Sequence, residues 1–186
     1  FGDEIGMNNI KFDKVEQYND VELLTNYAQV KAKGGDLKRF LEGMKISSRD
    51  NGRTPMQWDT TLNAGFSNGK PWLPVNGNYK TINVAAQEKD ENSCLNYFRK
   101  MIRLRKDNDI LVYGKYTLLD KTNPDVFAYT RELNGEKLLV LLNFSDKTTS
   151  INTGVDVSKG RILINNYSTP SVGGTLKPYE AVIYQL

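Results

Sequence analysis

At 186 residues, the chain is long enough to bury the core of one large domain or of two small ones. Hydrophobic residues make up 39% and charged residues 25%, and the net charge of +3 comes from interspersed signs, so the composition does not indicate a nucleic-acid-binding protein. The single cysteine, Cys94, excludes an intramolecular disulfide and agrees with a reducing compartment. No apolar run approaches the roughly 20 residues that span a membrane. We therefore expect no nucleic-acid partner and no membrane partner.

Histidine is absent from the sequence, which limits the chemistry that the chain can perform. Ser-His and Cys-His nucleophile systems and histidine-ligated metal sites are excluded within the chain. Because there is only one cysteine, a structural zinc site is excluded as well. We expect no metal site and no cofactor.

The opening residues, FGDEIGMNN, show no leader, cap or turn, as if the chain began inside a secondary-structure element. If Asp3 and Glu4 lie on a strand, they point to opposite faces of it. They then cannot form the pair of opposed carboxylates, about 5–9 Å apart, that a glycosidase uses. A structural role is expected for both acids.

Two helices and a long loop are predicted next. Residues 14–33 carry apolar side chains at helical spacing and end at two glycines, and residues 36–45 place an apolar face behind Asp36 as a plausible N-cap. Residues 47–87 are rich in Gly, Asn and Pro and show no clear period. A loop of this length in a compact domain is usually functional or in contact with something large.

The second half of the chain begins with a helix and then changes period. Residues 92–108 have acids at the start and bases at the end, which suits the helix dipole. From residue 110 the period is two, and Asn134-Gly135 is a strong hairpin signal. The predicted strands are 114–119, 126–133, 136–144, 148–153, 160–167 and 180–186.

The segment SRDNGRTPMQWD, residues 48–59, combines two arginines, two aspartates and a tryptophan in twelve residues. Such a loop can bind a polar ligand, or it can be held in place by its own ion pairs. Trp72 poses the same choice, because it can stack on a sugar or close a loop over the core. The residues alone leave both choices open.

Together with GDEIGMNN, NAGFSNGKPWLPVNGNYKTINV and LKPYEAVIYQL, this segment resembles the α-glucosidase and oligo-1,6-glucosidase group of glycoside hydrolase family 13, in the α-amylase superfamily. Members typically carry GEEIGM.N at the end of the eighth barrel strand, then RDNARTPMQWD, then PW..VN.NY..INV. The same motifs occur here in the same order. Asp3 replaces the usual Glu and Gly52 the usual Ala, and both departures are mild.

The resemblance implies an α+β fragment of a larger enzyme. Residues 1–109 would be the C-terminal end of a (β/α)8 TIM barrel, with the end of strand eight and the loop and helices after it. Residues 110–186 would be an all-β antiparallel Greek-key sandwich. The family's catalytic Asp, Glu and Asp follow strands four, five and seven and would lie upstream of Phe1. No catalytic residue is therefore expected in this chain, which should be inactive alone.

The implied parent is a retaining α-glucosidase that cleaves α-1,6 or α-1,4 bonds of short oligosaccharides in a bacterial cytoplasm. Its partners would be the oligosaccharide substrate and the rest of the catalytic barrel. The resemblance places Arg49 near the glucose-binding subsite, where it would pair with an upstream acid and a sugar hydroxyl. Asp50 and Arg53 are further substrate-binding candidates, although Arg53 is expected mainly to brace the loop.

Two alternatives remain. The parent could be a sucrose isomerase or a trehalose-forming transglycosidase. The chain could also be a non-catalytic carbohydrate-binding or interaction module, which would need an exposed aromatic platform on the sandwich. The candidates for that platform are Tyr113, Tyr116, Tyr129, Tyr167, Tyr179 and Tyr184.

Overall fold

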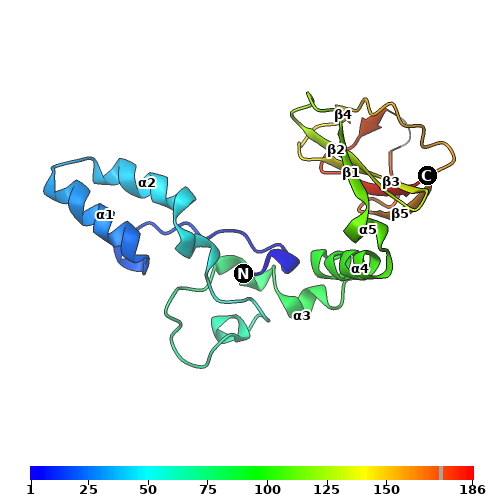
Figure 1. Cartoon of the computed structure of the whole chain (residues 1–186). Helices are drawn as coiled ribbons and strands as arrows, with labels where there is room; N and C mark the ends of the chain where they lie inside the picture. Colours follow the sequence, from blue (N-terminus) through cyan, green and yellow to red (C-terminus); the bar gives the residue numbers. More distant parts are fainter. Residues whose placement is uncertain (172–173) are drawn as a thin grey trace. The chain divides into compact units, whose positions relative to one another are not determined.

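The computed structural model describes residues 1–171 and 174–186, which form two compact units, 1–98 and 99–186 (Figure 1). The division falls inside helix α4 (Cys94–Asp107), before residue 109, where the change of period suggested a boundary. The first unit consists of helices and loops, and the second is built around an antiparallel sheet.

The first predicted helix is shorter than expected. Only Val21–Ala32 form α1, and Val15–Gln17 form a separate 3-10 turn, so the prediction over residues 14–33 is wrong in its first part. The reason is Asp20, whose side chain accepts hydrogen bonds from the first backbone N–H groups of α1 and so fixes where the helix begins.

Helix α2 (Leu37–Ser47) follows α1 after a tight turn at Gly34, which has a left-handed φ of 66°. Asp36 caps α2 by accepting from the backbone N–H of Arg39 at 3.0 Å, which confirms the predicted cap. The two helices form a hairpin, and the rings of Tyr27 and Phe40 meet edge-on between them.

The core of the first unit lies beside this hairpin. Its fully buried members are Phe12, Tyr18, Leu23 and Leu73. The rings of Phe12 and Tyr18 meet edge-on with their centroids 4.9 Å apart. Because Leu73 belongs to this core, the irregular loop contributes to the packing.

The strand end expected at the start of the chain is not observed. Asp3–Ile5 form a 3-10 turn (η1), and residues 1–98, all of which the structure describes, contain no strand. A barrel strand needs neighbouring strands to accept and donate its backbone hydrogen bonds. The first unit supplies none, so the segment closes on itself. The loop region contains the 3-10 turns η3 (Arg49–Gly52), η4 (Leu62–Gly65) and η5 (Gly77–Lys80) and the short helix α3 (Val84–Gln87).

The second unit contains α5 (Ile110–Tyr113) and a five-stranded sheet in the order β1-β2-β3-β7-β5. The strands of this sheet are β1 (Lys115–Leu119), β2 (Val126–Leu133), β3 (Glu136–Asn143), β5 (Arg161–Asn165) and β7 (Ala181–Gln185). All neighbouring pairs are antiparallel. The predicted hairpin is confirmed, because Asn134 and Gly135 join β2 to β3 with φ of 52° and 85°.

The second sheet has two short strands. The strand expected over 148–153 shrinks to β4 (Thr149–Ser150), which pairs with β6 (Thr175–Leu176), a strand that was not predicted. Two residues are too few to show a period, so no sequence pattern could have marked β6.

The five-stranded sheet is covered on both faces. One face packs on Leu176 and the segment from Ile151 to Val157, and the other packs on α5 and on Met101 and Leu104 of α4. This explains the unbroken apolar run of β3, because a strand buried on both faces does not alternate.

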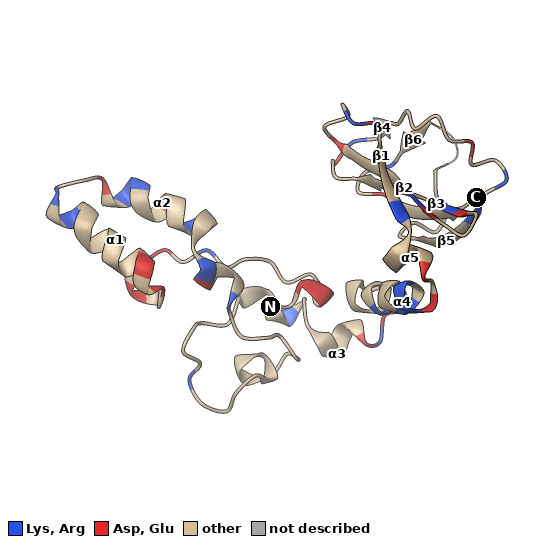
Figure 2. Cartoon of the chain, in the orientation of Figure 1, with Lys and Arg blue, Asp and Glu red and all other residues tan. Residues whose placement is uncertain are grey.

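Charged residues of both signs occur along each unit (Figure 2). No helix among residues 1–171 and 174–186 is long and apolar enough to cross a membrane.

Candidate functional site

The segment of residues 48–59 follows α2 directly, and hydrogen bonds hold it from its first residue onward. Ser48 caps η3, with its hydroxyl oxygen accepting from the backbone N–H of Asp50 at 3.3 Å. Asn51 is fully buried, and its side-chain amide donates to the carbonyl of Met44 at 2.9 Å. The backbone around Arg49 is therefore held from both sides.

Arg49 is one of two candidates that the structure leaves accessible, the other being Arg53. Its side chain is 51% exposed, and its Nη2 lies 3.2 Å from Oδ1 of Asp20, whose side chain is only 9% exposed. The guanidinium is thus tethered at one nitrogen, while about half of the side chain remains exposed. A guanidinium has five N–H donors, so donors remain for a ligand.

Asp50, the second candidate, is placed differently. It is 3% exposed, and its Oδ2 accepts from the backbone N–H of Asn19 at 2.7 Å. This short, charge-assisted bond joins the loop to the residue before the α1 cap. In this structure Asp50 fastens the loop rather than facing outward.

Arg53 does not form the brace that was expected of it. Its backbone N–H donates to the carbonyl of Asp50 at 3.1 Å, but the side chain is exposed. Among the described residues the Arg53 guanidinium has no hydrogen bond and no ion pair.

The second half of the segment is held by Gln57 and Asp59. Gln57 is fully buried and donates through Nε2 to the carbonyl of Ile82 at 2.5 Å, while its own backbone carbonyl accepts from Val84. The carboxylate of Asp59 accepts from the hydroxyl and the backbone N–H of Thr61, and these bonds lower the pKa of Asp59. Asp59 is therefore a turn residue here.

Motifs far apart in the sequence converge on this loop. The backbone N–H of Ile10 donates to the carbonyl of Asn51, and the terminal amine of Phe1 donates to the carbonyl of Gly52. The side chains of Asn76 and Asn78 bind Asn8 at 2.8–3.1 Å. The opening segment thus lies between the loop and the stretch around η5.

A cavity of about 480 Å³ lies beside Trp72 in the same unit. Trp72 is 70% exposed, and its carbonyl accepts from the side chain of Asn19 at 2.8 Å. Within residues 1–98, then, the indole lies at the wall of an open cavity instead of covering the core. Asn63, Lys70 and Tyr79 are among the polar residues that line it.

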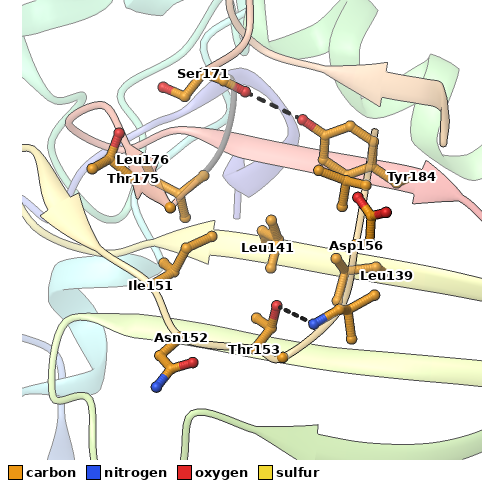
Figure 3. A pocket seen from close by; sticks show the side chains of 14 residues that line it. Leu139, Leu141, Ile151, Asn152, Thr153, Asp156, Ser171, Thr175, Leu176 and Tyr184 are labelled. Atoms are coloured by element: carbon orange, nitrogen blue, oxygen red, sulfur yellow. Dashed lines mark hydrogen bonds between the residues drawn. The ribbon is translucent and has the colours of Figure 1, made fainter. Parts of the chain in front are cut away.

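The second unit has a cavity of about 380 Å³ between β3 and the segment of residues 151–157 (Figure 3). Its wall includes core residues such as Leu139 and Leu141, and the hydroxyl of Tyr184 donates to the carbonyl of Ser171 at its edge. This cavity marks the junction between the sheet and its covering segment.

The six candidate tyrosines do not form one flat surface. Tyr184 is buried, and Tyr167 donates its hydroxyl to the carbonyl of Pro178. Tyr129 packs between Tyr116 and Phe127 at centroid distances of 5.1 and 5.2 Å with tilted rings. Rings inclined by 42° and 51° to one another do not form a coplanar platform for a sugar. Tyr113 and Tyr179 are well exposed, at 73% and 61%.

No cluster of three or more Cys, Asp or Glu side chains able to hold a metal ion occurs in residues 1–171 and 174–186.

Comparison with known proteins identifies the family. Residues 1–114 match the alpha amylase catalytic domain, and residues 116–183 match the maltogenic amylase C-terminal domain. The chain belongs to the alpha-amylase family. The two matches follow one another along the chain in the order that the sequence motifs predicted, and they meet near the start of β1.

Three proteins similar to this chain have names that describe three different activities. The chain is 42% identical to an oligo-1,6-glucosidase of Bacillus cereus over 191 residues, covering 100% of this chain and 34% of the relative. The crystal structure of a trehalose-6-phosphate hydrolase of Bacillus licheniformis has a TM-score of 0.89 and 39% identity, covering 99% of this chain and 34% of that one. An isomaltulose synthase of Klebsiella sp. LX3 has a TM-score of 0.90 and 36% identity over the same shares. The chain thus spans about a third of the length of these relatives.

Two residues at this site were missed by the sequence reasoning. Asp20 contacts Arg49, and Ser48 contacts Asp20 and Asp50, yet both look like ordinary helix caps. The available signal was an Asp directly before the apolar run of α1. It indicates a cap but says nothing of a partner in a loop 29 positions away.

Proposed function

We propose that the polypeptide to which this chain belongs is a retaining α-glucosidase that hydrolyses α-1,6 or α-1,4 glucosidic bonds of short oligosaccharides. The observation that carries this proposal is the 42% identity to an oligo-1,6-glucosidase across the entire chain. Retaining hydrolysis uses a pair of carboxylates about 5 Å apart. By the family resemblance, those groups belong to the part of the barrel that precedes Phe1, and the rest of the barrel is the proposed partner of residues 1–109.

Within this chain we propose that Arg49 contacts the glucose unit. Loops at the C-terminal face of such barrels build the active site. The guanidinium is half exposed and tethered at one nitrogen, which supports a role in binding a hydroxyl. Asp50 would support the loop through its hydrogen bond with the backbone of Asn19. The side chain of Arg53, which is exposed and unbonded among the described residues, is available to a ligand or to the remainder of the barrel.

The activity is tested with the complete enzyme and four substrates: isomaltose, maltose, trehalose 6-phosphate and sucrose. Release of α-glucose from isomaltose or maltose, observed by NMR before mutarotation, is the expected result. Two other outcomes correspond to the names of similar structures, a trehalose-6-phosphate hydrolase and an isomaltulose synthase. Cleavage restricted to trehalose 6-phosphate, or conversion of sucrose into an isomer, would replace the proposed substrate.

A bacterial, cytoplasmic location is part of the same proposal. The relatives reported above come from bacteria, and the lone Cys94 agrees with a reducing compartment. Fractionation of the source cells with an antibody against the chain tests it, and recovery in the secreted fraction would contradict it.

The non-catalytic alternative is less well supported. The aromatic rings that cluster on the sheet, those of Tyr116, Tyr129 and Phe127, are tilted against each other. Isothermal titration of the chain with maltose and isomaltose is expected to show no binding that depends on Tyr116. Loss of measurable sugar binding in Tyr116→Ala would favour the binding module.

A further inference from the structure

The carboxylate of Asp20 serves two elements at once. Its Oδ1 accepts from the backbone N–H of Glu22 at 3.1 Å and of Leu23 at 3.4 Å, which starts α1. The same oxygen lies 3.2 Å from Nη2 of Arg49. A single buried oxygen therefore joins the N-terminus of a helix to the guanidinium of the candidate sugar-binding arginine.

The geometry between these two segments is doubly fixed. Oδ2 of Asp20 lies 3.5 Å from the hydroxyl of Ser48, which itself accepts from the backbone N–H of Asp50. One residue earlier, the backbone N–H of Asn19 donates to Asp50 at 2.7 Å. Residues 19–20 and 48–50 are thus linked on both sides of the ion pair, so the carboxylate cannot shift without moving the loop.

The ion pair is asymmetric in exposure. The side chain of Asp20 is 9% exposed and that of Arg49 is 51% exposed, and Asp20 is the sole described side chain bound to that guanidinium. An arginine side chain loses rotamer freedom when it binds a ligand. A buried, immobile carboxylate removes part of that freedom before the ligand arrives and leaves the outer N–H groups available.

We propose that Asp20 is a positioning residue that holds the Arg49 guanidinium in the orientation needed to bind the sugar. The effect of Asp20 on sugar binding rests on the proposed function, since Asp20 acts on the substrate only through Arg49. The carboxylate of Asp20 both caps α1 and pairs with Arg49, and substitutions can remove the ion pair while keeping the cap.

Asp20→Ser and Asp20→Asn are the informative variants. Ser, Asn and Asp are comparable N-caps, so α1 should still begin at Val21. Ser is too short to reach Arg49, and Asn lacks the charge. Asp36→Ser is the matched control, because Asp36 caps α2 through Arg39 and has no arginine side chain as a partner among the described residues.

The first readout needs no substrate. In the 186-residue chain, NMR of the arginine side chains should show slowed rotation of the Arg49 guanidinium in the wild type. Asp20→Ser should remove that signature while tryptophan fluorescence, which reports on Trp58 and Trp72 in the first unit, stays unchanged. A mobile Arg49 in the wild type would overturn the proposal irrespective of what the enzyme cleaves.

The second readout is a double-mutant cycle in the complete enzyme with isomaltose. Asp20→Ser should lower kcat/KM about 10- to 100-fold, as misplaced binding groups do, and Asp36→Ser should leave it within about twofold of wild type. Combined with Arg49→Ala, Asp20→Ser should cause little further loss, because its effect passes through Arg49. Additive losses would contradict a positioning role. Absence of any isomaltose cleavage by the wild type would overturn the proposed function but leave the NMR result standing.

Discussion

The buried carboxylate of Glu180 accepts hydrogen bonds from both the backbone N–H and the hydroxyl of Ser171, each at 2.6 Å. The backbone N–H of Lys177 donates to it at 2.7 Å. Burial acts to raise the pKa of Glu180, but these bonds outweigh it and hold the pKa below its ordinary value of 4.5. One carboxylate therefore fastens two backbone segments to the start of β7.

Glu180→Gln should destabilise the second unit at pH 7 by about 1.5–3 kcal/mol, the usual worth of hydrogen bonds to a charged group. Because the folded-state pKa lies below the unfolded one, this stabilisation is fully present above about pH 4.5 and is lost as the pH falls through the folded-state pKa. The wild type should thus lose stability in acid more steeply than the variant. Thermal melting followed by the amide signals of β7 measures both effects.

The control is Glu136→Gln, since Glu136 is exposed at the start of β3. It should melt like the wild type at pH 7. Equal melting of Glu180→Gln and Glu136→Gln at pH 7 would show that the Ser171 contacts contribute nothing.

Gly65→Ala should destabilise the first unit. Gly65 has a left-handed φ of 67°, and an added Cβ would lie 2.8 Å from the carboxylate of Asp59. The left-handed conformation alone costs a residue with a Cβ about 1–2 kcal/mol. Urea unfolding followed by tryptophan fluorescence reports on this unit, because both tryptophans, Trp58 and Trp72, lie in it.

Gly69→Ala is the matched control in the same loop. Its φ is not left-handed, and its added Cβ would meet only the Ser67 hydroxyl at 3.8 Å. We expect a change within about 0.5 kcal/mol, as for ordinary surface substitutions. A Gly65→Ala variant as stable as Gly69→Ala would mean that the loop adopts another conformation in solution.

Gln57→Leu should cost the first unit about 1–3 kcal/mol, because the half-buried carbonyl of Ile82 loses its side-chain donor. Gln29→Leu, at an exposed position on α1, provides the comparison and should be nearly neutral. If both variants unfold at the same urea concentration, Gln57 does not hold the two ends of the loop together.

The sequence predicted the features that depend on residues close together in the chain. The caps and apolar spacing around Asp36 predicted α2, and Asn134-Gly135 predicted the turn between β2 and β3. These are local signals, in which a residue and its partner lie within a few positions. The family motifs likewise predicted the order of the two matched domains.

The site was harder to predict because its contacts are non-local. Nothing in residues 14–33 shows that Asp20 would meet Arg49, and nothing in the segment SRDNGRTPMQWD shows that Asp50 would turn inward while Arg53 stays exposed. The strand end expected at the start of the chain is absent for a related reason, since a strand forms only where another chain segment can pair with it.

The purified 186-residue chain should not hydrolyse p-nitrophenyl α-glucoside. Retaining hydrolysis requires two positioned carboxylates, and the family resemblance assigns neither to this chain. The complete enzyme, assayed in parallel, should turn over the same substrate. Turnover by the chain alone, after removal of trace contaminants by a second purification, would show that a catalytic pair lies within these residues.

Arg49 is proposed to bind the sugar, whereas Arg53 is expected to contribute little to kcat/KM. The direct measurement is kcat/KM for isomaltose in the complete enzyme with Arg49→Ala and Arg53→Ala, each checked for an unchanged melting temperature. Loss of a charged hydrogen-bond donor costs about 1.5–3 kcal/mol, so Arg49→Ala should lower kcat/KM about 10- to 100-fold. Arg53→Ala should stay within about threefold of the wild type, since binding energy rests mainly on a few groups. A kcat/KM for Arg49→Ala near that of the wild type would show that Arg49 does not bind the sugar and that the loop has only a structural role.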